Sequence, residues 1–176
     1  MEQTRVPHVV LLPFPAYGHI KPMLSLAKLF SHAGFRITFV NTEQYHDRLF
    51  GNTDVTAFYK HFPNFLCTSI PDGLPPDNPR FGIYIKDWFC SNKPVSKLAF
   101  RQLLMTPGRL PTCIISDSIM SFAIDVAEEL NIPIITFRPY SAYCSWSDFH
   151  FSKLAEEGEL PVTGRFLCFI LKNIYI

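Results

Sequence analysis

The sequence predicts an α/β fold, in which an open parallel sheet carries helices on both faces. The first observation is a series of short apolar runs rich in β-branched residues, which is typical of strands buried on both faces. The second is that segments with a helical spacing of apolar residues alternate with these runs. The third is length, because 176 residues with 48% apolar side chains suit one domain with a sizeable core.

The first strand–helix–strand passage takes about 35 residues, which is the size of a parallel crossover unit. Residues 8–13 (HVVLLP) have the pattern of a buried strand, and residues 35–40 (FRITFV) have that of the next strand. A helix is expected from His19, after a short loop that contains proline and glycine. Pro22 falls in its first turn, where a missing N–H costs least, and Gly34 ends it.

The same alternation continues along the rest of the chain. The expected elements are strand 65–70, a loop with four prolines at 71–79, helix 82–104, strand 112–116, helix 118–130, strand 134–137 and helix 141–157. Pro94 weakens the helical pattern of residues 82–104. The last stretch, 164–176, has no polar helical face, and the pattern gives it no place in the fold.

Composition argues against several classes of protein. The formal charge is +1, from 16 basic and 15 acidic residues without a basic run, so no nucleic-acid partner is expected. The six histidines lack the H-x-x-x-H spacing of a helical metal site, so no metal is expected. Five cysteines without a C-x-x-C pair favour reduced thiols in a cytoplasmic protein. The polar N-terminus predicts no signal peptide, and the apolar run 166–171 is far shorter than the ~20 residues that cross a bilayer.

Two titratable residues follow strands of the predicted sheet. His19 follows the first strand and Asp117 follows strand 112–116, 98 residues later. Ligands bind at the carboxyl ends of strands in open α/β sheets, so both loops can meet at one edge. A carboxylate there could accept the N–H of the imidazole, fix its tautomer and leave it to act as a general base. The alternatives are that His19 is simply a polar residue of a first helical turn and that Asp117 caps helix 118–130.

Motifs of two other enzyme classes are missing. The segment P-A-Y-G-H-I has one glycine where a dinucleotide-binding G-x-G-x-x-G motif has three, and G-K-[ST] is absent. The serines at 116, 118 and 121 do not form the G-x-S-x-G turn of α/β-hydrolases. The sequence therefore favours neither a dehydrogenase nor an α/β-hydrolase.

Three segments resemble the plant UDP-dependent glycosyltransferases of family 1. They are HVVLLPFPAYGHIKPMLSLAKLFSHAGFRITFVNTE, IPDGLPPD and TCIISDSIMSFAIDVAEELNIPIITF. They follow one another at the intervals typical of the family, and the similarity runs from about residue 7 to about residue 162. The run FRPYSAYCSW, with Arg138 where many members have tryptophan, is most similar to the branch that glucosylates iridoids of the 7-deoxyloganetic acid type.

The resemblance implies a GT-B enzyme, in which two Rossmann-like domains face each other across a cleft. Residues 1–163 would be the N-terminal, acceptor-binding domain in truncated form, and residues 164–176 a divergent tail outside the family pattern. The second domain, which holds the UDP-sugar and carries the segment H-C-G-W-N-S in this family, is absent from the sequence.

The resemblance also implies an activity, namely the inverting transfer of a hexose from a UDP-sugar to a hydroxyl or carboxyl of a small plant metabolite. His19 would be the general base, and Asp117 would orient and stabilise it. UDP-glucose would be the co-substrate, and the family needs neither a metal nor a tightly bound cofactor. The partners implied are a small apolar acceptor, such as a terpenoid or a phenolic, and the missing donor domain.

Further substrate contacts are expected beside the base. They are Gly18, Tyr17, Trp88, Tyr140 and Ser141, with Phe81, Tyr143 and Trp146 as further aromatic candidates. Gly18 would let the backbone approach a substrate closely, and Tyr17 would form a wall of the acceptor pocket. For the aromatic residues the alternative is an ordinary position in the core or on the surface. Pro139 stands where many relatives have a threonine that reaches the donor sugar, so that contact is not expected here.

Two functions therefore remain open for this chain. Without a donor-binding domain it is expected to transfer sugar poorly or not at all, because the rate depends on holding both reactants together. The alternative is a non-catalytic fragment that binds small molecules or regulates related proteins.

Overall fold

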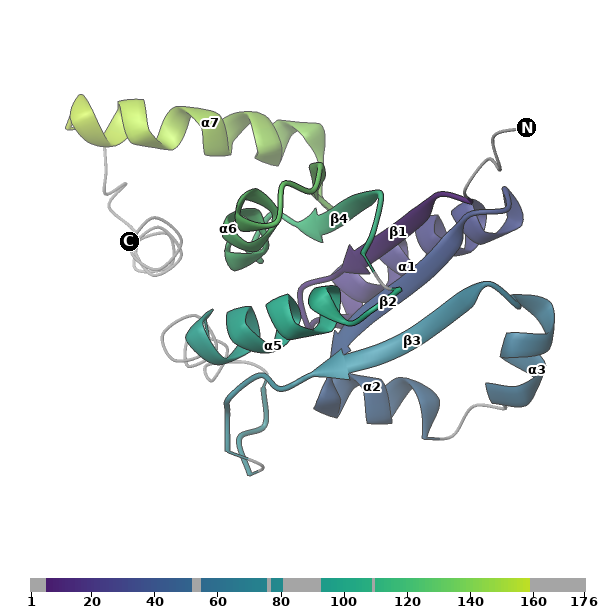
Figure 1. Cartoon of the computed structure of the whole chain (residues 1–176). Coiled ribbons are helices and arrows are strands. Elements are labelled where there is room, and N and C mark those ends of the chain that lie inside the picture. The colour runs from purple at the N-terminus through teal and green to yellow at the C-terminus, as the bar shows by residue number, and fades with distance from the viewer. Residues whose placement is uncertain (1–5, 52–54, 76, 81–92, 109, 159–176) are drawn as a thin grey trace.

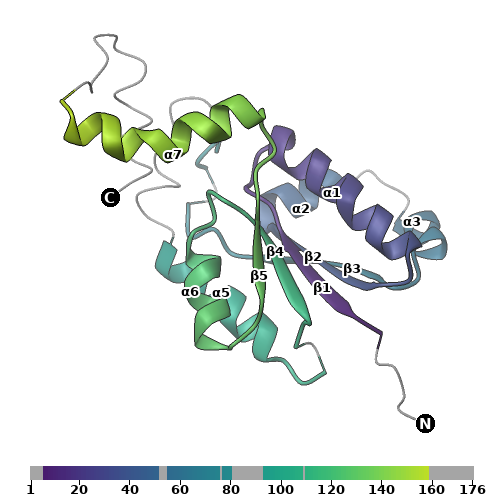
Figure 2. The same ribbon diagram turned by 90° about the horizontal axis from the view of Figure 1, so that it is seen from above.

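The computed structural model describes residues 6–51, 55–75, 77–80, 93–108 and 110–158. Five strands form one parallel sheet in the order β3-β2-β1-β4-β5 (Figures 1 and 2, with β5 labelled in Figure 2). Their bounds are β1 His8–Leu12, β2 Arg36–Thr42, β3 Phe65–Ile70, β4 Cys113–Asp117 and β5 Ile134–Phe137. The predicted parallel sheet is therefore confirmed: β3 and β5 have the expected bounds, and the ends of the other three strands differ from the expected ones by at most two residues.

Helices cover both faces of the sheet, as predicted (Figure 2). Their bounds are α1 Tyr17–His32, α2 Glu43–Phe50, α3 Val55–His61, α5 Lys93–Met105, α6 Phe122–Glu129 and α7 Ala142–Glu156. Side chains of β1 alternate between the two layers because successive residues of a strand point to opposite faces. Val9 and Leu11 pack with α1, whereas Val10 and Leu12 pack with α5 and α6.

The segment after β4 differs from its prediction. The sequence pattern places a helix at 118–130, but residues 118–121 form a turn and α6 begins at Phe122. The cause is Asp117, whose carbonyl accepts a hydrogen bond from the Met120 N–H and whose Oδ1 accepts one from the Ile119 N–H. An aspartate that bonds its own following backbone in this way builds a turn instead of a helix start. The interpretation of Asp117 as the cap of this helix is therefore wrong.

Three other helical segments bear on the predictions. Helix α5 begins at Lys93, so Pro94 lies in its first turn, where it is tolerated, while residues 82–92 of the predicted helix lie outside the described residues. Helices α2 and α3 have no counterpart among the predictions. They span eight and seven residues, which is too short for apolar periodicity to stand out and too short for stability without the sheet.

The sheet ends at β5, and helix α7 follows it. Figures 1 and 2 both place α7 at the opposite end of the molecule from α3. Ile135 of the edge strand β5 is 56% exposed, and Trp146 of α7 is 66% exposed. Tyr143 and Phe149 of the same helix are also largely exposed. The described part of the chain therefore leaves apolar surface uncovered at this end of the sheet.

The described cysteines predict a clear order of reactivity. Cys67, Cys113 and Cys144 are all free, and burial raises the pKa of the Cys67 thiol to about 12. Because the thiolate is the reactive form, iodoacetamide at pH 8 should modify the exposed Cys144 and leave Cys67 intact. Peptide mass spectrometry after timed labelling checks this, with a sample unfolded in guanidinium chloride as the control. Equal rates for Cys67 and Cys144 in the folded protein would contradict the described burial.

Candidate active site

His19 lies in the first turn of α1, directly after the loop that leaves β1. The carbonyl of Ala16 accepts hydrogen bonds from the N–H groups of His19 and Ile20, both at 2.9 Å, so the turn is fixed by its own backbone. The buried ring of Phe14 packs against the imidazole in an edge-to-face arrangement, with ring centroids 5.1 Å apart. These contacts hold the histidine ring at the carboxyl edge of the sheet.

Asp117 is the last residue of β4, and the sheet topology brings it to His19. β1 and β4 are neighbours, with Leu12 paired to Ser116, so the ends of both strands meet at one edge. Nδ1 of His19 lies 2.8 Å from Oδ2 of Asp117, although the two residues are 98 positions apart. The aspartate side chain is 0% exposed and the histidine side chain 23% exposed. Asp117 is therefore shielded from solvent, whereas solvent reaches the ring of His19.

The hydrogen bonds of this pair define where the proton sits. A carboxylate only accepts hydrogen bonds, so the imidazole donates from Nδ1 and keeps a lone pair on Nε2. Nε2 has no hydrogen-bond partner among the described residues. Both carboxylate oxygens are used, because Oδ1 accepts from Ile119 while Oδ2 accepts from His19. The arrangement can therefore take a proton at Nε2, with Asp117 stabilising the imidazolium that forms.

Tyr17 and Gly18, both predicted to contact substrate, precede His19 in the first turn of α1. The Tyr17 side chain is mostly exposed and meets the ring of Tyr45 edge to face, with centroids 5.6 Å apart. A Cβ built on Gly18 would have no other heavy atom within 4 Å. Both residues therefore border open space beside the histidine, and their contact with substrate stays a prediction.

Tyr140 and Ser141 have structural partners at the start of α7. The Tyr140 hydroxyl donates to Oδ2 of Asp148 at 2.9 Å and accepts from Nη1 of Arg138 at 3.0 Å. Burial raises the pKa of this hydroxyl above its usual value. Arg138 also pairs with Asp148 at 2.8 Å, and Oγ of Ser141 accepts from the Cys144 N–H as the cap of α7.

The remaining aromatic candidates are not gathered at His19 by the described structure. Tyr143 and Trp146 lie exposed on α7, and no described contact joins either one to the histidine. Phe81 and Trp88 lie outside the described residues.

The same edge of the sheet carries a pocket of about 440 Å³ beyond β2 and β3. It is lined by Glu43, Gln44, Asp47, residues 71–74 and Arg80. The guanidinium of Arg80 donates two hydrogen bonds to the carboxylate of Asp72, from Nε to Oδ2 at 2.8 Å and from Nη2 to Oδ1 at 3.0 Å. These bonds raise the pKa of the guanidinium above its usual range. They also fold back the loop that contains IPDGLPPD, so that it borders this pocket.

Two buried polar residues at the end of β2 were missed by the sequence interpretation. Asn41 and Thr42 are almost fully buried, and neither the amide of Asn41 nor the hydroxyl of Thr42 has a hydrogen-bond partner among the described residues. Buried polar groups are nearly always bonded, so such orphans are unusual. Their sequence signal is weak, namely two polar residues that close an apolar strand at the carboxyl edge.

The described residues contain neither a candidate metal site nor a candidate membrane span. Nowhere among them do three or more histidine, cysteine or acidic side chains gather closely enough to hold a metal ion. Within that same part of the chain, every helix is too short or too polar to cross a bilayer.

Comparisons with known proteins agree with the fold and with the resemblance. No family model matches the chain. The chain is 38% identical over 180 residues to a 7-deoxyloganetic acid glucosyltransferase of Catharanthus roseus, with 98% of this chain and 37% of the relative covered. It is 45% identical over 158 residues to mogroside I-A1 synthase of Siraitia grosvenorii, with 88% and 29% covered. Among solved structures, UGT89C1 of Arabidopsis thaliana complexed with UDP-L-rhamnose matches with a TM-score of 0.61 and 25% identity, over 79% of this chain and 37% of that one.

These matches define the structural class of the domain. The sheet and helices are those of the N-terminal, Rossmann-like domain of GT-B glycosyltransferases. Over nearly its whole length, the chain is a relative of the plant UDP-glycosyltransferases, 7-deoxyloganetic acid glucosyltransferase among them, which confirms the resemblance. It spans only about a third of the length of these curated relatives.

The His19–Asp117 geometry predicts the tautomer of the free imidazole. In its neutral form, the His19 ring should carry its proton on Nδ1, because the Asp117 carboxylate accepts there. Long-range ¹⁵N–¹H correlation NMR reads the tautomer directly. Asp117→Asn should shift the population toward the Nε2–H form, while the ring of His32, exposed at the other end of α1, serves as the internal control. An Nε2–H tautomer of His19 in the unsubstituted chain would contradict the described hydrogen bond.

Proposed function

We propose that this chain is the acceptor-binding part of a plant UDP-glycosyltransferase, with His19 as general base and Asp117 as its partner. The observation that carries the proposal is the 2.8 Å hydrogen bond between these side chains at the carboxyl edge of the sheet. It leaves Nε2 of His19 without a partner among the described residues, on a ring that solvent reaches. The kinship with plant UDP-glycosyltransferases supports the same assignment.

The proposed reaction follows from this geometry. Nε2 of His19 removes the proton of an acceptor hydroxyl, and the oxygen attacks the anomeric carbon of the UDP-sugar. The bond from that carbon to the UDP oxygen breaks, so UDP leaves with the electron pair and the configuration at the carbon is inverted. The buried charge of Asp117 stabilises the imidazolium during this step.

The substrates are proposed from the relatives. The names of two matched proteins, 7-deoxyloganetic acid glucosyltransferase and UGT89C1 complexed with UDP-L-rhamnose, favour a UDP-sugar donor. We take glucose as the sugar and a small, largely apolar metabolite as the acceptor. Tyr17 and Gly18 border the open space beside His19 and would form part of its wall. The orphaned polar groups of Asn41 and Thr42 at the same sheet edge suit a ligand that also carries polar groups.

The described surface supports placing this chain within a larger enzyme. The uncovered apolar side chains of β5 and α7 are of the kind that a further part of a protein would bury. The chain spans about a third of its curated relatives, so the donor half of the reaction is proposed to lie outside it. The three free cysteines among the described residues suit a reducing compartment, and we place the protein in the cytoplasm on that ground.

A second candidate function is the binding of small acceptors by this chain without transfer of sugar. The two functions differ in whether the chain needs a donor domain to show activity.

A chimaera tests the catalytic proposal. Residues 1–162 joined to the corresponding remainder of the Catharanthus roseus 7-deoxyloganetic acid glucosyltransferase should transfer glucose from UDP-glucose to 7-deoxyloganetic acid. In that chimaera His19→Ala should lower kcat by about 10²–10⁴-fold, because the general base is lost. His32→Ala is the matched control, since His32 lies exposed at the far end of the same helix, and it should leave kcat unchanged. Full activity of the His19→Ala chimaera would refute the assignment of the base.

Titrations of the chain by itself test the proposed division between an acceptor-binding part and a donor-binding part. Isothermal titration of UDP-glucose into the 176-residue protein should give no binding at micromolar concentrations, because the groups that hold the donor are proposed to lie elsewhere. Titration of 7-deoxyloganetic acid should give binding that survives His19→Ala if the chain is an acceptor-binding fragment. Micromolar affinity for UDP-glucose would show that the donor site is complete in this chain and would overturn the division proposed above.

A further inference from the structure

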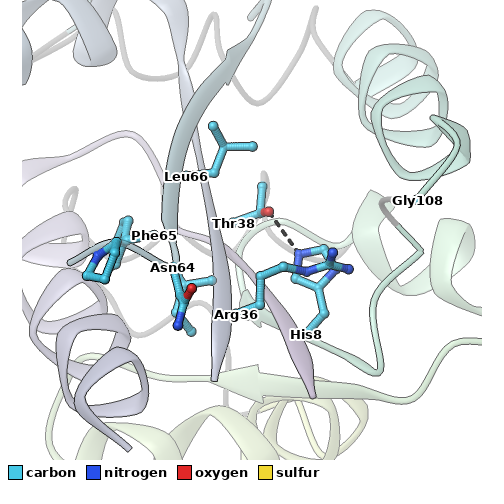
Figure 3. A pocket seen from close by; sticks show the side chains of 9 residues that line it. His8, Arg36, Thr38, Asn64, Phe65, Leu66 and Gly108 are labelled. Carbon is cyan, nitrogen blue, oxygen red and sulfur yellow. Dashed lines mark hydrogen bonds between the residues drawn. The ribbon is translucent and has the colours of Figure 1, made fainter. Parts of the chain in front are cut away.

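A second pocket lies at the edge of the sheet opposite to His19, where the strands begin. It has a volume of about 360 Å³ and opens beside the first residues of β1, β2 and β3 (Figure 3). Its lining residues are His8, Arg36, Ile37, Thr38, Pro63, Asn64, Phe65, Leu66 and Gly108. The proposed sugar transfer uses none of them, so the pocket calls for an explanation of its own.

The sheet register explains why these side chains face one another. His8 pairs with Arg36 across β1 and β2, and Thr38 pairs with Leu66 across β2 and β3. Paired residues of parallel strands point to the same face, and residues two apart along a strand do so too. His8, Arg36, Thr38 and Leu66 therefore project from one face of the sheet, as Figure 3 shows.

Among the described residues that line this pocket, Arg36 supplies the only charged side chain. Its Nη2 donates a hydrogen bond to Nδ1 of His8 at 3.1 Å, which fixes the direction of the guanidinium. Nε and Nη1 of Arg36 have no partner among the described residues, and the lining contains no carboxylate that could neutralise the charge. An oriented guanidinium with free N–H groups is suited to an oxyanion.

His8 acts as a support for Arg36 and does not compete with it for a ligand. A guanidinium only donates, so Nδ1 of His8 must accept, and the ring proton sits on Nε2. That proton is donated to Oγ1 of Thr38 at 2.9 Å. The histidine and the threonine are both buried, so this chain of hydrogen bonds is shielded from water. It holds Arg36 at the mouth of the pocket.

The opposite wall of the pocket is apolar. Leu66 is 37% exposed although it sits in a strand, and Pro63 lies two residues before that strand. A volume of about 360 Å³ falls at the lower end of the range for small-molecule sites. A single cation beside an apolar wall fits a monovalent anion with a hydrocarbon body better than inorganic phosphate, which recruits several cationic or N–H donors.

We propose that this pocket binds a small organic monocarboxylate, whose carboxylate pairs with Arg36 and whose apolar body lies against Leu66. The site stands at the other end of the strands from His19 and is independent of the glycosyltransferase proposal. Benzoate serves as the probe, because it combines one carboxylate with a compact apolar ring.

The test is titration of benzoate into the whole chain. Isothermal calorimetry measures the affinity, and NMR of the histidine rings locates the site. Benzoate should bind and shift the His8 resonances while leaving those of His19 unchanged. Arg36→Gln should weaken binding about tenfold or more, since a charge-assisted hydrogen bond is lost. Arg48→Gln removes the same charge from α2 and is the matched control, for which the affinity should not change. Leu66→Asp, which leaves the guanidinium in place, should abolish binding through repulsion of the carboxylate.

Three outcomes would overturn the proposal. The first is benzoate binding that Arg36→Gln does not weaken, with circular dichroism showing that the variant is folded. The second is binding that shifts His19 instead of His8. The third is binding of inorganic phosphate in an Arg36-dependent manner without binding of benzoate, which would assign the pocket to a different class of ligand. His19→Ala should keep its affinity for benzoate, so failure here and failure of the proposed catalytic role are distinguishable.

Discussion

The side-by-side pairing of β1 with β4 is the constraint on which the candidate active site depends. Residues almost a hundred positions apart meet because both strands run in the same direction and end at the same edge. Their hydrogen bond then joins the first turn of α1 to the last residue of β4. Had the two strands been antiparallel, His19 and Asp117 would lie at opposite ends of the sheet. The chemistry proposed for this chain is thus a consequence of strand direction and order.

The two edges of the sheet use histidine in opposite ways. At the carboxyl edge, Nδ1 of His19 donates to a carboxylate, which leaves Nε2 with a lone pair that can accept a proton. At the amino edge, Nδ1 of His8 accepts from Arg36, and Nε2 donates to Thr38, so both ring nitrogens are occupied. The first arrangement suits proton transfer, and the second suits the orientation of a cation. The neighbours of each ring decide its role, because the ring itself is the same.

The strands and the His19–Asp117 pair could be predicted from the sequence, because both follow from the pattern of residues along single strands. The apolar runs are continuous because the strands are buried on both faces, so β1 and β3 were found within one residue of their ends. The meeting of His19 and Asp117 followed from parallel strands and from their positions at strand ends. The turn after Asp117 was missed, because the apolar spacing of 118–130 continues through it while a side-chain hydrogen bond stops the helix. The hydrogen bonds of Tyr140 with Asp148 and of Ser141 with Cys144 could not be predicted from the sequence. They depend on where Asp148 and Cys144 lie once α7 has formed.

The order of the strands has a consequence for how the chain can fold while it is being synthesised. β2 pairs with β1, β3 with β2, β4 with β1 and β5 with β4, so each strand finds a partner that the ribosome has already released. After β1, no strand has to wait for a later one, and only the arrival of β4 closes a long loop. The sheet can therefore grow outward from β1 in the direction of translation. In the described sheet this growth ends at two edge strands, β3 on one side and β5 on the other.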